Sequence, residues 1–297
     1  MKTRHVGVAV NVEAPFEALF LSDSHLPLCD CRDGDRKAAL AAGRNAEMNN
    51  APRYLEEALG FAESRSALLL HAGDLIDFTS AANFDAAKRC FSRGKWILAC
   101  VGNHEFSQFV GEAEENATYR AQSAAAVQAV WPNDIDFASK VVNGVNFVAL
   151  DNSYYRFSEF HLVRMKAEVE KGLPIVMLCH VPLHAPGHYA NQMRRTGGIC
   201  AYECGVPDGL VDSWRKEREW PENERWRDRR VQQRSDKATN KFIEYLRAQP
   251  LLKAVLTGHT HAFWEERFSS TAVQFTCPAL FNGEALSISF DTVGRTS

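Results

Sequence analysis

Short apolar runs alternate along the chain with longer segments in which apolar residues recur at helical spacing. The apolar runs predict buried strands at residues 16–22, 66–72, 95–102, 174–179 and 251–257. The amphipathic segments predict helices at residues 50–64, 83–93, 111–130, 157–171 and 236–248. Asn143-Gly144 predicts a hairpin turn within residues 137–151, and short strands are expected in residues 262–290. This alternation is typical of an α/β protein.

The regular alternation stops at residues 186–235. This segment has no clean strand pattern, several glycines and prolines, and three of the six tryptophans, Trp214, Trp220 and Trp226. Its basic and acidic side chains nearly balance. We interpret the chain as one domain over residues 1–297 that carries an insertion at about 186–235. The insertion is either a lid over a functional site or a surface excursion packed by its own tryptophans.

The composition is that of a soluble globular protein. The chain has 297 residues, is 45% apolar and has a net charge of −3, so nothing in the totals favours a nucleic-acid or membrane partner. No apolar run approaches the roughly 20 residues needed to cross a bilayer, and polar residues interrupt the N-terminal run early. We therefore expect a cytoplasmic protein. The eight cysteines lack the paired spacing of a zinc knuckle and are expected to be reduced thiols.

Polar residues with metal-binding atoms follow five of the predicted strands. The clusters are Asp23-Ser24-His25, Gly73-Asp74-Leu75-Ile76-Asp77, Gly102-Asn103-His104-Glu105, His180 and Gly258-His259-Thr260-His261. Ligand sites in open α/β sheets gather at the carboxyl ends of the strands. We therefore expect these five clusters to meet in one cleft.

The residue types in these clusters suit divalent transition metals. Carboxylate, amide and imidazole donors favour Mn, Fe, Zn, Co or Ni over Ca or Cu(I). Residues two apart in an extended segment point the same way, so Asp23 and His25 can reach one ion. His259 and His261 can reach two ions that lie side by side. The glycines at 73, 102 and 258 let the backbone turn tightly and approach the metals.

Taken together, the series Asp23-x-His25, Gly73-Asp74-x-x-Asp77, Gly102-Asn103-His104-Glu105, His180 and Gly258-His259-x-His261 resembles the calcineurin-like metallophosphoesterase family. The resemblance spans residues 17 to about 265. It implies a four-layer α/β/β/α sandwich, in which two mixed β-sheets are flanked by helices. It also implies two transition-metal ions, for which Mn, Fe and Zn are the candidates. One ion would be held by Asp23, His25, Asp74 and His261, and the other by Asp74, Asn103, His180 and His259.

The resemblance also implies roles for the remaining motif residues. Asp74 would bridge the two ions, and His104 would face the substrate phosphate and leaving group without binding metal. Asp77 would orient a ligand histidine or the turn itself. Glu105 either supports the site in the same way or forms a salt bridge or helix cap. Two ions about 3.5–4 Å apart would bind phosphate oxygens and lower the pKa of a bridging water for in-line attack.

Candidate substrate-binding residues follow His180. His184 and His188 either line the substrate pocket or form loop hydrogen bonds. Arg194 and Arg195 offer guanidinium groups suited to phosphate. Tyr189 and Tyr202 offer flat faces for a ring.

The best-supported function is metal-dependent hydrolysis of phosphate esters, with monoester and diester substrates both open. One alternative is an inactive scaffold of the same fold that binds protein partners, although the scaffold would have no reason to keep every ligand and His104. Another alternative is a nuclease. A nuclease needs a basic groove for the nucleic acid, and the nearly balanced charges of residues 186–235 do not supply one. A tyrosine at the position of Asp77 would have suggested a purple acid phosphatase, so the aspartate argues against that class of enzyme. We expect a small phosphate ester as the partner.

Overall fold

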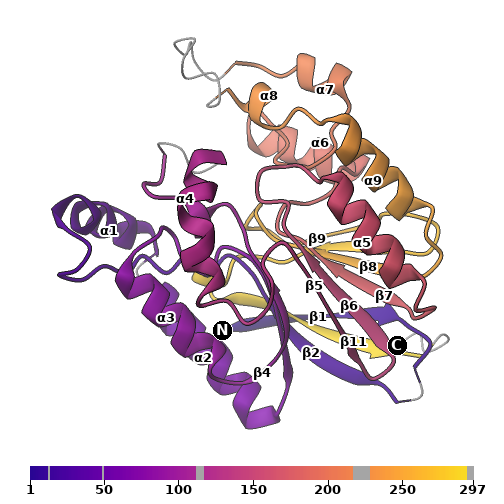
Figure 1. Ribbon diagram of the computed structural model, residues 1–297, viewed down its shortest axis with the longest axis horizontal. Helices are drawn as coiled ribbons and strands as arrows, with labels where there is room; N and C mark the ends of the chain where they lie inside the picture. Colours follow the sequence, from indigo (N-terminus) through magenta and orange to yellow (C-terminus); the bar gives the residue numbers. More distant parts are fainter. Residues whose placement is uncertain (13, 49, 112–116, 217–227, 293–297) are drawn as a thin grey trace.

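Two β-sheets pack face to face in the computed structural model, which describes residues 1–12, 14–48, 50–111, 117–216 and 228–292 (Figure 1). The first sheet has the order β1 (Lys2–Ala9), β11 (Glu284–Asp291), β2 (Phe16–Leu21), β3 (Leu68–Ala72) and β4 (Lys95–Cys100). The second has the order β5 (Phe137–Val142), β6 (Val145–Leu150), β7 (Ile175–Leu178), β8 (Leu252–Thr257), β10 (Val273–Thr276) and β9 (Trp264–Arg267). Both sheets mix parallel and antiparallel pairs.

Helices cover the outer face of each sheet. The first sheet is flanked by α2 (Ala51–Arg65), α3 (Ala81–Phe91) and α4 (Ala117–Gln128), and the second by α5 (Glu159–Val169) and α9 (Lys237–Arg247), whereas α1 (Asp35–Met48) lies further out at the left of Figure 1. Three apolar clusters join these layers. One lies between the sheets and includes Phe20, Phe147 and Phe290, and each of the others joins one sheet to its helices. The predicted four-layer α/β/β/α sandwich is therefore confirmed.

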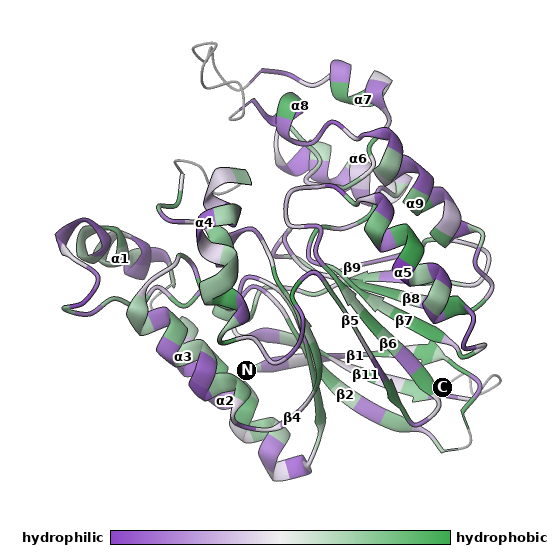
Figure 2. Cartoon of the chain, viewed as in Figure 1, coloured by the Kyte–Doolittle hydropathy of each residue, from purple (hydrophilic) through white to green (hydrophobic). Residues whose placement is uncertain are grey.

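The central strands of the second sheet explain why their sequences read as continuous apolar runs. All residues of β6 and β7 are buried, because one face meets the other sheet and the other face meets α5 and α9. Figure 2 shows this hydrophobic character along β6, β7 and β8, while the helices carry hydrophilic residues as well. The predicted hairpin joins β5 to β6, with positive φ at both Asn143 and Gly144.

Strand β1 and helix α1 were not predicted from the sequence, and neither were the helices within residues 186–235. Strand β1 is mostly exposed and pairs in parallel with β11 at the edge of its sheet, so its side chains show no buried strand pattern. Helix α1 buries only Ala41 and Met48, so little of its surface belongs to the core. Part of the helix predicted over 111–130 falls on residues outside those described, and α4 begins at Ala117.

The described parts of the segment 186–235, residues 186–216 and 228–235, form a helical excursion at one end of the second sheet. It contains α6 (Pro186–Arg195), α7 (Asp208–Asp212) and α8 (Arg229–Gln232), which lie together in Figure 1. Trp214 is buried in a small apolar cluster with Cys200 and Val211. Trp220 and Trp226 lie outside the described residues. Within the described part of the chain, no helix combines the length and the apolar character that crossing a membrane requires.

Candidate metal centre

The polar clusters predicted at five strand ends do meet at one place. The loops after β2, β3 and β4 come from the first sheet, and the loops after β7 and β8 come from the second. Asp23, His25 and His261 bring ligand atoms within 4.8 Å of one another. Asp74, His180 and His259 do the same. These two groups correspond to the two ligand sets that the family resemblance implies. The first group lacks Asp74, the shared carboxylate, and the second lacks Asn103.

The backbone is unusual at the residues that carry these donors. Five of them have positive φ, namely Asp23 (52°), His25 (47°), Asp74 (56°), His259 (69°) and His261 (58°). The left-handed region is uncommon for residues other than glycine, and strain of this kind gathers at functional sites. The strand-end turns therefore aim the side chains inward at a cost in conformational energy that the surrounding fold offsets.

Two glycines leave room for the ligands. A Cβ atom at position 102 would lie 2.2 Å from Asp74 Oδ1, and one at position 258 would lie 2.5 Å from Asp23 Oδ2 and 1.8 Å from Ser22 Oγ. Any larger residue would displace a carboxylate. Gly73 instead provides a turn, because its φ is 89°.

Hydrogen bonds from the far side of the rings orient two of the histidines. His25 Nδ1 lies 2.9 Å from Asp77 Oδ1, and His180 Nδ1 donates to the carbonyl of Ala72 at 2.7 Å. A neutral imidazole that donates from Nδ1 keeps a lone pair on Nε2. The Nε2 atoms of both rings therefore face the centre as acceptors, the orientation expected of metal ligands.

His259 is held in a different way. Its backbone N–H donates to Asp23 Oδ2 at 3.0 Å, and its Nε2 lies 2.7 Å from the hydroxyl of Tyr155. Its Nδ1 faces the centre, 3.1 Å from His180 Nε2. Tyr155 is fully buried and itself has a φ of 63°. The sequence gives no signal for this tyrosine, since it lies in a loop far along the chain from its partner.

The donor set fits a cation. His25 Nε2 lies 3.2 Å from His261 Nε2, so the two ring nitrogens face the same point of the centre. Asp74 Oδ2 and Asn103 Oδ1 are buried and accept no hydrogen bond from the described residues. Buried acceptors without a donor are costly. Positive ions between these atoms would satisfy all of them.

His104 lies at the edge of the same group. Its backbone N–H donates to Asp74 Oδ1 at 2.9 Å, and its Nδ1 lies 2.7 Å from the carbonyl of Asp77. It also brings a ring nitrogen within 4.8 Å of ligand atoms of His25 and Asp74. In the protein without bound cations, burial opposes protonation of His104, but Asp74 and Asp77 raise its pKa to about 10. The structure thus places His104 both beside the donors and on the wall of a pocket.

Asp77 is the link between two histidines and a helix. Besides His25, its carboxylate contacts His104 Nδ1 at 3.2 Å and accepts from Arg44 Nε at 2.6 Å. Burial alone would raise the pKa of Asp77, but Arg44 and the two histidines hold it well below the usual range. Arg44 lies on α1, a helix that the sequence pattern did not reveal.

Glu105 ties two of the strand-end loops together. Its buried carboxylate accepts from the backbone N–H groups of Asp74 (2.8 Å), Ile76 (3.2 Å) and Gly102 (2.6 Å). Burial and the nearby charge of Asp74 raise its pKa to about 7. Among the described residues its contacts are these backbone groups, not a salt bridge with a cation. Glu105 therefore shapes the turns that present Asp74 and Asn103.

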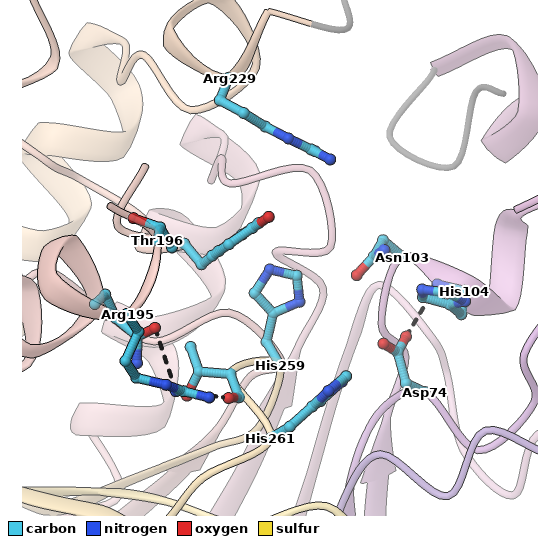
Figure 3. A pocket seen from close by; sticks show the side chains of 11 residues that line it. Asp74, Asn103, His104, Arg195, Thr196, Arg229, His259 and His261 are labelled. Atoms are coloured by element: carbon cyan, nitrogen blue, oxygen red, sulfur yellow. Dashed lines mark hydrogen bonds between the residues drawn. The ribbon is translucent and has the colours of Figure 1, made fainter. Parts of the chain in front are cut away.

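A cavity of about 360 Å³ opens directly onto the donors (Figure 3). Asp74, Asn103, His104, His259 and His261 form one side. The opposite side comes largely from the segment 186–235, and its lining residues are Gln192, Arg195, Thr196, Tyr202 and Arg229. Figure 3 shows Arg195 and Arg229 across the cavity from Asp74 and His104. Arg195 and Tyr202 were expected near the substrate, whereas Gln192, Thr196 and Arg229 were not singled out in the sequence.

Other residues expected near the substrate lie elsewhere. His184 Nδ1 and His188 Nδ1 contact the two carboxylate oxygens of the buried Glu203, at 2.7 and 2.5 Å. Burial lowers the pKa of both histidines to about 4. Arg194 is exposed and contacts Asn191 at 3.4 Å. Among the described residues, these three are not part of the cavity wall, and the histidines instead secure the start of α6.

Tyr189 also lies inside the excursion and away from the cavity. Its hydroxyl accepts from Trp214 Nε1 at 3.0 Å, and its ring packs against the small cluster around Trp214. The structure does not decide between the lid and the surface excursion that the sequence suggested for the segment 186–235. The segment is packed in part by its own tryptophan, and it also borders the site.

The sequence matches the model of the calcineurin-like phosphoesterase family over residues 16–263. No curated protein matches it. Among solved structures, it is similar to a dimetal phosphatase from Danio rerio (14% identity, 90% of this chain and 88% of that chain, TM-score 0.47). It is also similar to TT1561 of Thermus thermophilus (12% identity, 90% of this chain and 91% of that chain, TM-score 0.44). A third similar structure is a 5′-nucleotidase from Candida albicans (12% identity, 94% of this chain and 47% of that chain, TM-score 0.42). Since the family match covers most of the chain and the family's ligand residues converge in the fold, the protein belongs to the calcineurin-like phosphoesterases.

Proposed function

We propose that this protein hydrolyses phosphate esters at a binuclear transition-metal centre. The observation that carries the proposal is the convergence of two groups of buried donors on one cavity, with acceptors that no described side chain satisfies. A closed structural site would be surrounded by protein ligands on all sides. Here the donors border a space that a small ester could enter.

The residues divide into two ligand sets. One set consists of Asp23, His25, Asp74 and His261, and the other of Asp74, Asn103, His180 and His259. Bound there, Mn, Fe or Zn ions would supply positive charge for the phosphate oxygens and help to activate a water nucleophile. Asp74 is the shared member, because one of its oxygens lies 3.0 Å from His180 Nε2 and 3.6 Å from His25 Nε2.

His104 is the residue proposed to act on the substrate itself. The carbonyl of Asp77 occupies its Nδ1, which leaves Nε2 for the cavity. In hydrolysis, the oxygen of water forms a bond to phosphorus and the ester P–O bond breaks. A protonated His104 can donate from Nε2 to the leaving oxygen, which departs as an alcohol, or can stabilise the charged phosphoryl group.

Replacement of the shared carboxylate tests this proposal. Purified protein should contain up to two transition-metal equivalents and hydrolyse chromogenic phosphate mono- or diesters. Asp74→Ala should lower the content of both metals and abolish turnover, because it removes a ligand from each set. The matched control is Asp208→Ala, whose carboxylate is exposed on α7.

Elemental analysis and the ester assay decide the outcome together. Normal metal content in Asp74→Ala would overturn the ligand assignment. Metal-loaded wild-type protein that hydrolyses neither ester class would instead support the scaffold alternative.

A further inference from the structure

The cavity next to the metal centre is basic on the side away from the proposed ligands. Arg195 and Arg229 both line it, and the one carboxylate among its described lining residues is Asp74, which is itself a proposed ligand. Positive ions at the centre would add to this charge. The cavity as a whole therefore favours a ligand with more than one negative charge.

Arg195 is attached to the metal-binding loop. It is the last residue of α6, and its Nη1 donates to the carbonyl of Thr260 at 3.0 Å. Thr260 separates the two ligand histidines that follow β8. In the described part of the chain, no carboxylate lies within 4.0 Å of the Arg195 guanidinium. Its charge is therefore held close to the centre without an acidic partner.

Arg229 approaches from a second helix. It is the first residue of α8, and its Nη1 donates to Gln232 Oε1 at 2.7 Å. Its guanidinium carbon lies 5.7 Å from the centroid of the Tyr202 ring, and that ring lies 5.6 Å from the ring of His259. Tyr202 thus connects Arg229 to the metal centre and offers an aromatic surface on the way.

The buried hydroxyl of Thr260 is a second indication that a ligand binds near Arg195. Thr260 is only 6% exposed, and its Oγ1 has no hydrogen-bond partner among the described residues. Thr260 lines the cavity beside Arg195. An anion at this point of the wall would lie beside a hydroxyl that has no acceptor of its own among the described residues.

We propose that the substrate carries a second anionic group, a phosphate or a carboxylate, on its leaving group, and that Arg195 and Arg229 bind this group. The inference rests on the proposed function, which places the scissile phosphate at the centre. Guanidinium groups match both anions because they donate two parallel hydrogen bonds. A volume of about 360 Å³ suits a small molecule better than a nucleic-acid strand.

Pairs of substrates that differ only in the second anion test the inference. Adenosine 5′-monophosphate and adenosine 3′,5′-bisphosphate differ by a phosphate on the leaving group, and glycerol 3-phosphate and 3-phosphoglycerate differ by a carboxylate. The wild type should have a kcat/KM about 10- to 100-fold higher for the preferred doubly anionic member, the range expected for charge-assisted hydrogen bonds. The pair that shows the larger ratio identifies the anion. Equal values within both pairs would overturn the inference.

Single replacements then assign the effect to the arginines. Arg195→Ala and Arg229→Ala should each raise KM for the doubly anionic substrate while leaving the singly anionic member and 4-nitrophenyl phosphate nearly unchanged. Arg194→Ala is the matched control, because Arg194 is the adjacent arginine and does not line the cavity. A preference that survives both replacements, or an equal loss on every substrate at normal metal content and melting temperature, would contradict the assignment.

A binding measurement separates this inference from the proposed function. Adenosine 3′-monophosphate and glycerate are the leaving groups of the two probes, and their affinities for chelator-treated protein can be measured by calorimetry without turnover. At least one should bind the wild type and the Arg194→Ala variant about 10-fold more tightly than Arg195→Ala. If no ester is hydrolysed but this difference is found, the anion site stands and the proposed function fails. If esters are hydrolysed and no difference is found in binding or in KM, the anion site fails alone.

Discussion

The two sides of the cavity are built in different ways. On the side of the metal centre, Asp23 and His180 are completely buried, and the backbone itself fixes where the donors point. On the opposite side, Arg195 and Arg229 are long side chains at helix ends, and their contacts include hydrogen bonds to the Thr260 carbonyl and to Gln232 respectively. The first side is a product of the sheets, and the second is a product of the segment 186–235.

The difference in construction suits the two sides to different tasks, hydrolysis on the side of the donors and substrate binding on the side of the segment 186–235. Donors that must share an ion need positions fixed within a fraction of an ångström, which strained turns and buried hydrogen bonds provide. The residues of a cavity wall that selects the leaving group can be replaced without disturbing those turns, because binding residues often lie on segments attached to a rigid scaffold. We therefore expect changes on the first side to affect metal content or rate for every substrate. Changes on the second side should affect only the choice of substrate.

The largest effect that tests this comparison is expected at His104. The residue lies on the first side and contacts Asp77, yet it is proposed to act on the phosphoryl group and not on the metals. His104→Ala should lower kcat by roughly 10²–10⁴-fold for all ester substrates, the range for general acid–base catalysis. Elemental analysis should find the same metal content as in the wild type.

The position of His104 leaves two roles for this experiment to distinguish, metal ligand and substrate-binding residue. His104 has a ring nitrogen near the ligand atoms of His25 and Asp74, so a role as a metal ligand is sterically open. A parallel fall of metal content and rate in His104→Ala would show that it is a ligand. A loss confined to one class of leaving group would instead assign it to recognition.

A smaller effect is expected from closing the space beside a ligand. In Gly258→Ala, the new methyl group would meet Ser22 Oγ and Asp23 Oδ2. Because overpacking of this kind typically costs about 1–3 kcal/mol, the variant should melt at a lower temperature and bind metal more weakly. Gly209→Ala is the control on the other side of the cavity, since a Cβ atom there has no neighbour within 4 Å. Calorimetric melting curves and metal content should be normal in Gly209→Ala, and normal values in Gly258→Ala would contradict the packing argument.

The sequence predicted the side of the cavity that carries the strand-end donors more completely than the side formed by residues 186–235. Asp23, Asp74 and His180 could be placed because each follows a strand whose apolar run is continuous, and strand ends in such a sheet lie at a common edge. Local pattern and topology were sufficient there. The positive φ values of Asp23 and Asp74 were not predictable, since these residues are not glycine.

Contacts between distant segments could not be read from the pattern. Arg44 reaches Asp77 from a helix with only two buried residues, and its side chain is ordinary for an exposed helix. Arg229 was overlooked because the segment 186–235 contains many arginines and nothing local distinguishes one from another. For His184 and His188 the sequence left both cavity lining and loop hydrogen bonds open, and the fold of the loop directs both to Glu203.

Tyr155 provides the finest test of the comparison, because it supports a proposed ligand from the side remote from the cavity. Its hydroxyl lies 2.7 Å from His259 Nε2, while His259 Nδ1 faces the centre. Partners of this kind orient a ligand ring, and their removal typically lowers metal affinity about 10- to 100-fold. Tyr155→Phe keeps the ring beside His259 and removes only the hydroxyl. Dialysis against increasing chelator should release one metal equivalent earlier than in the wild type, with KM ratios between substrates unchanged. Tyr154→Phe is the matched control, because the ring of Tyr154 packs beside Phe106. If both variants release metal like the wild type, the hydroxyl of Tyr155 does not support the centre, and the backbone turn alone must hold His259 in place.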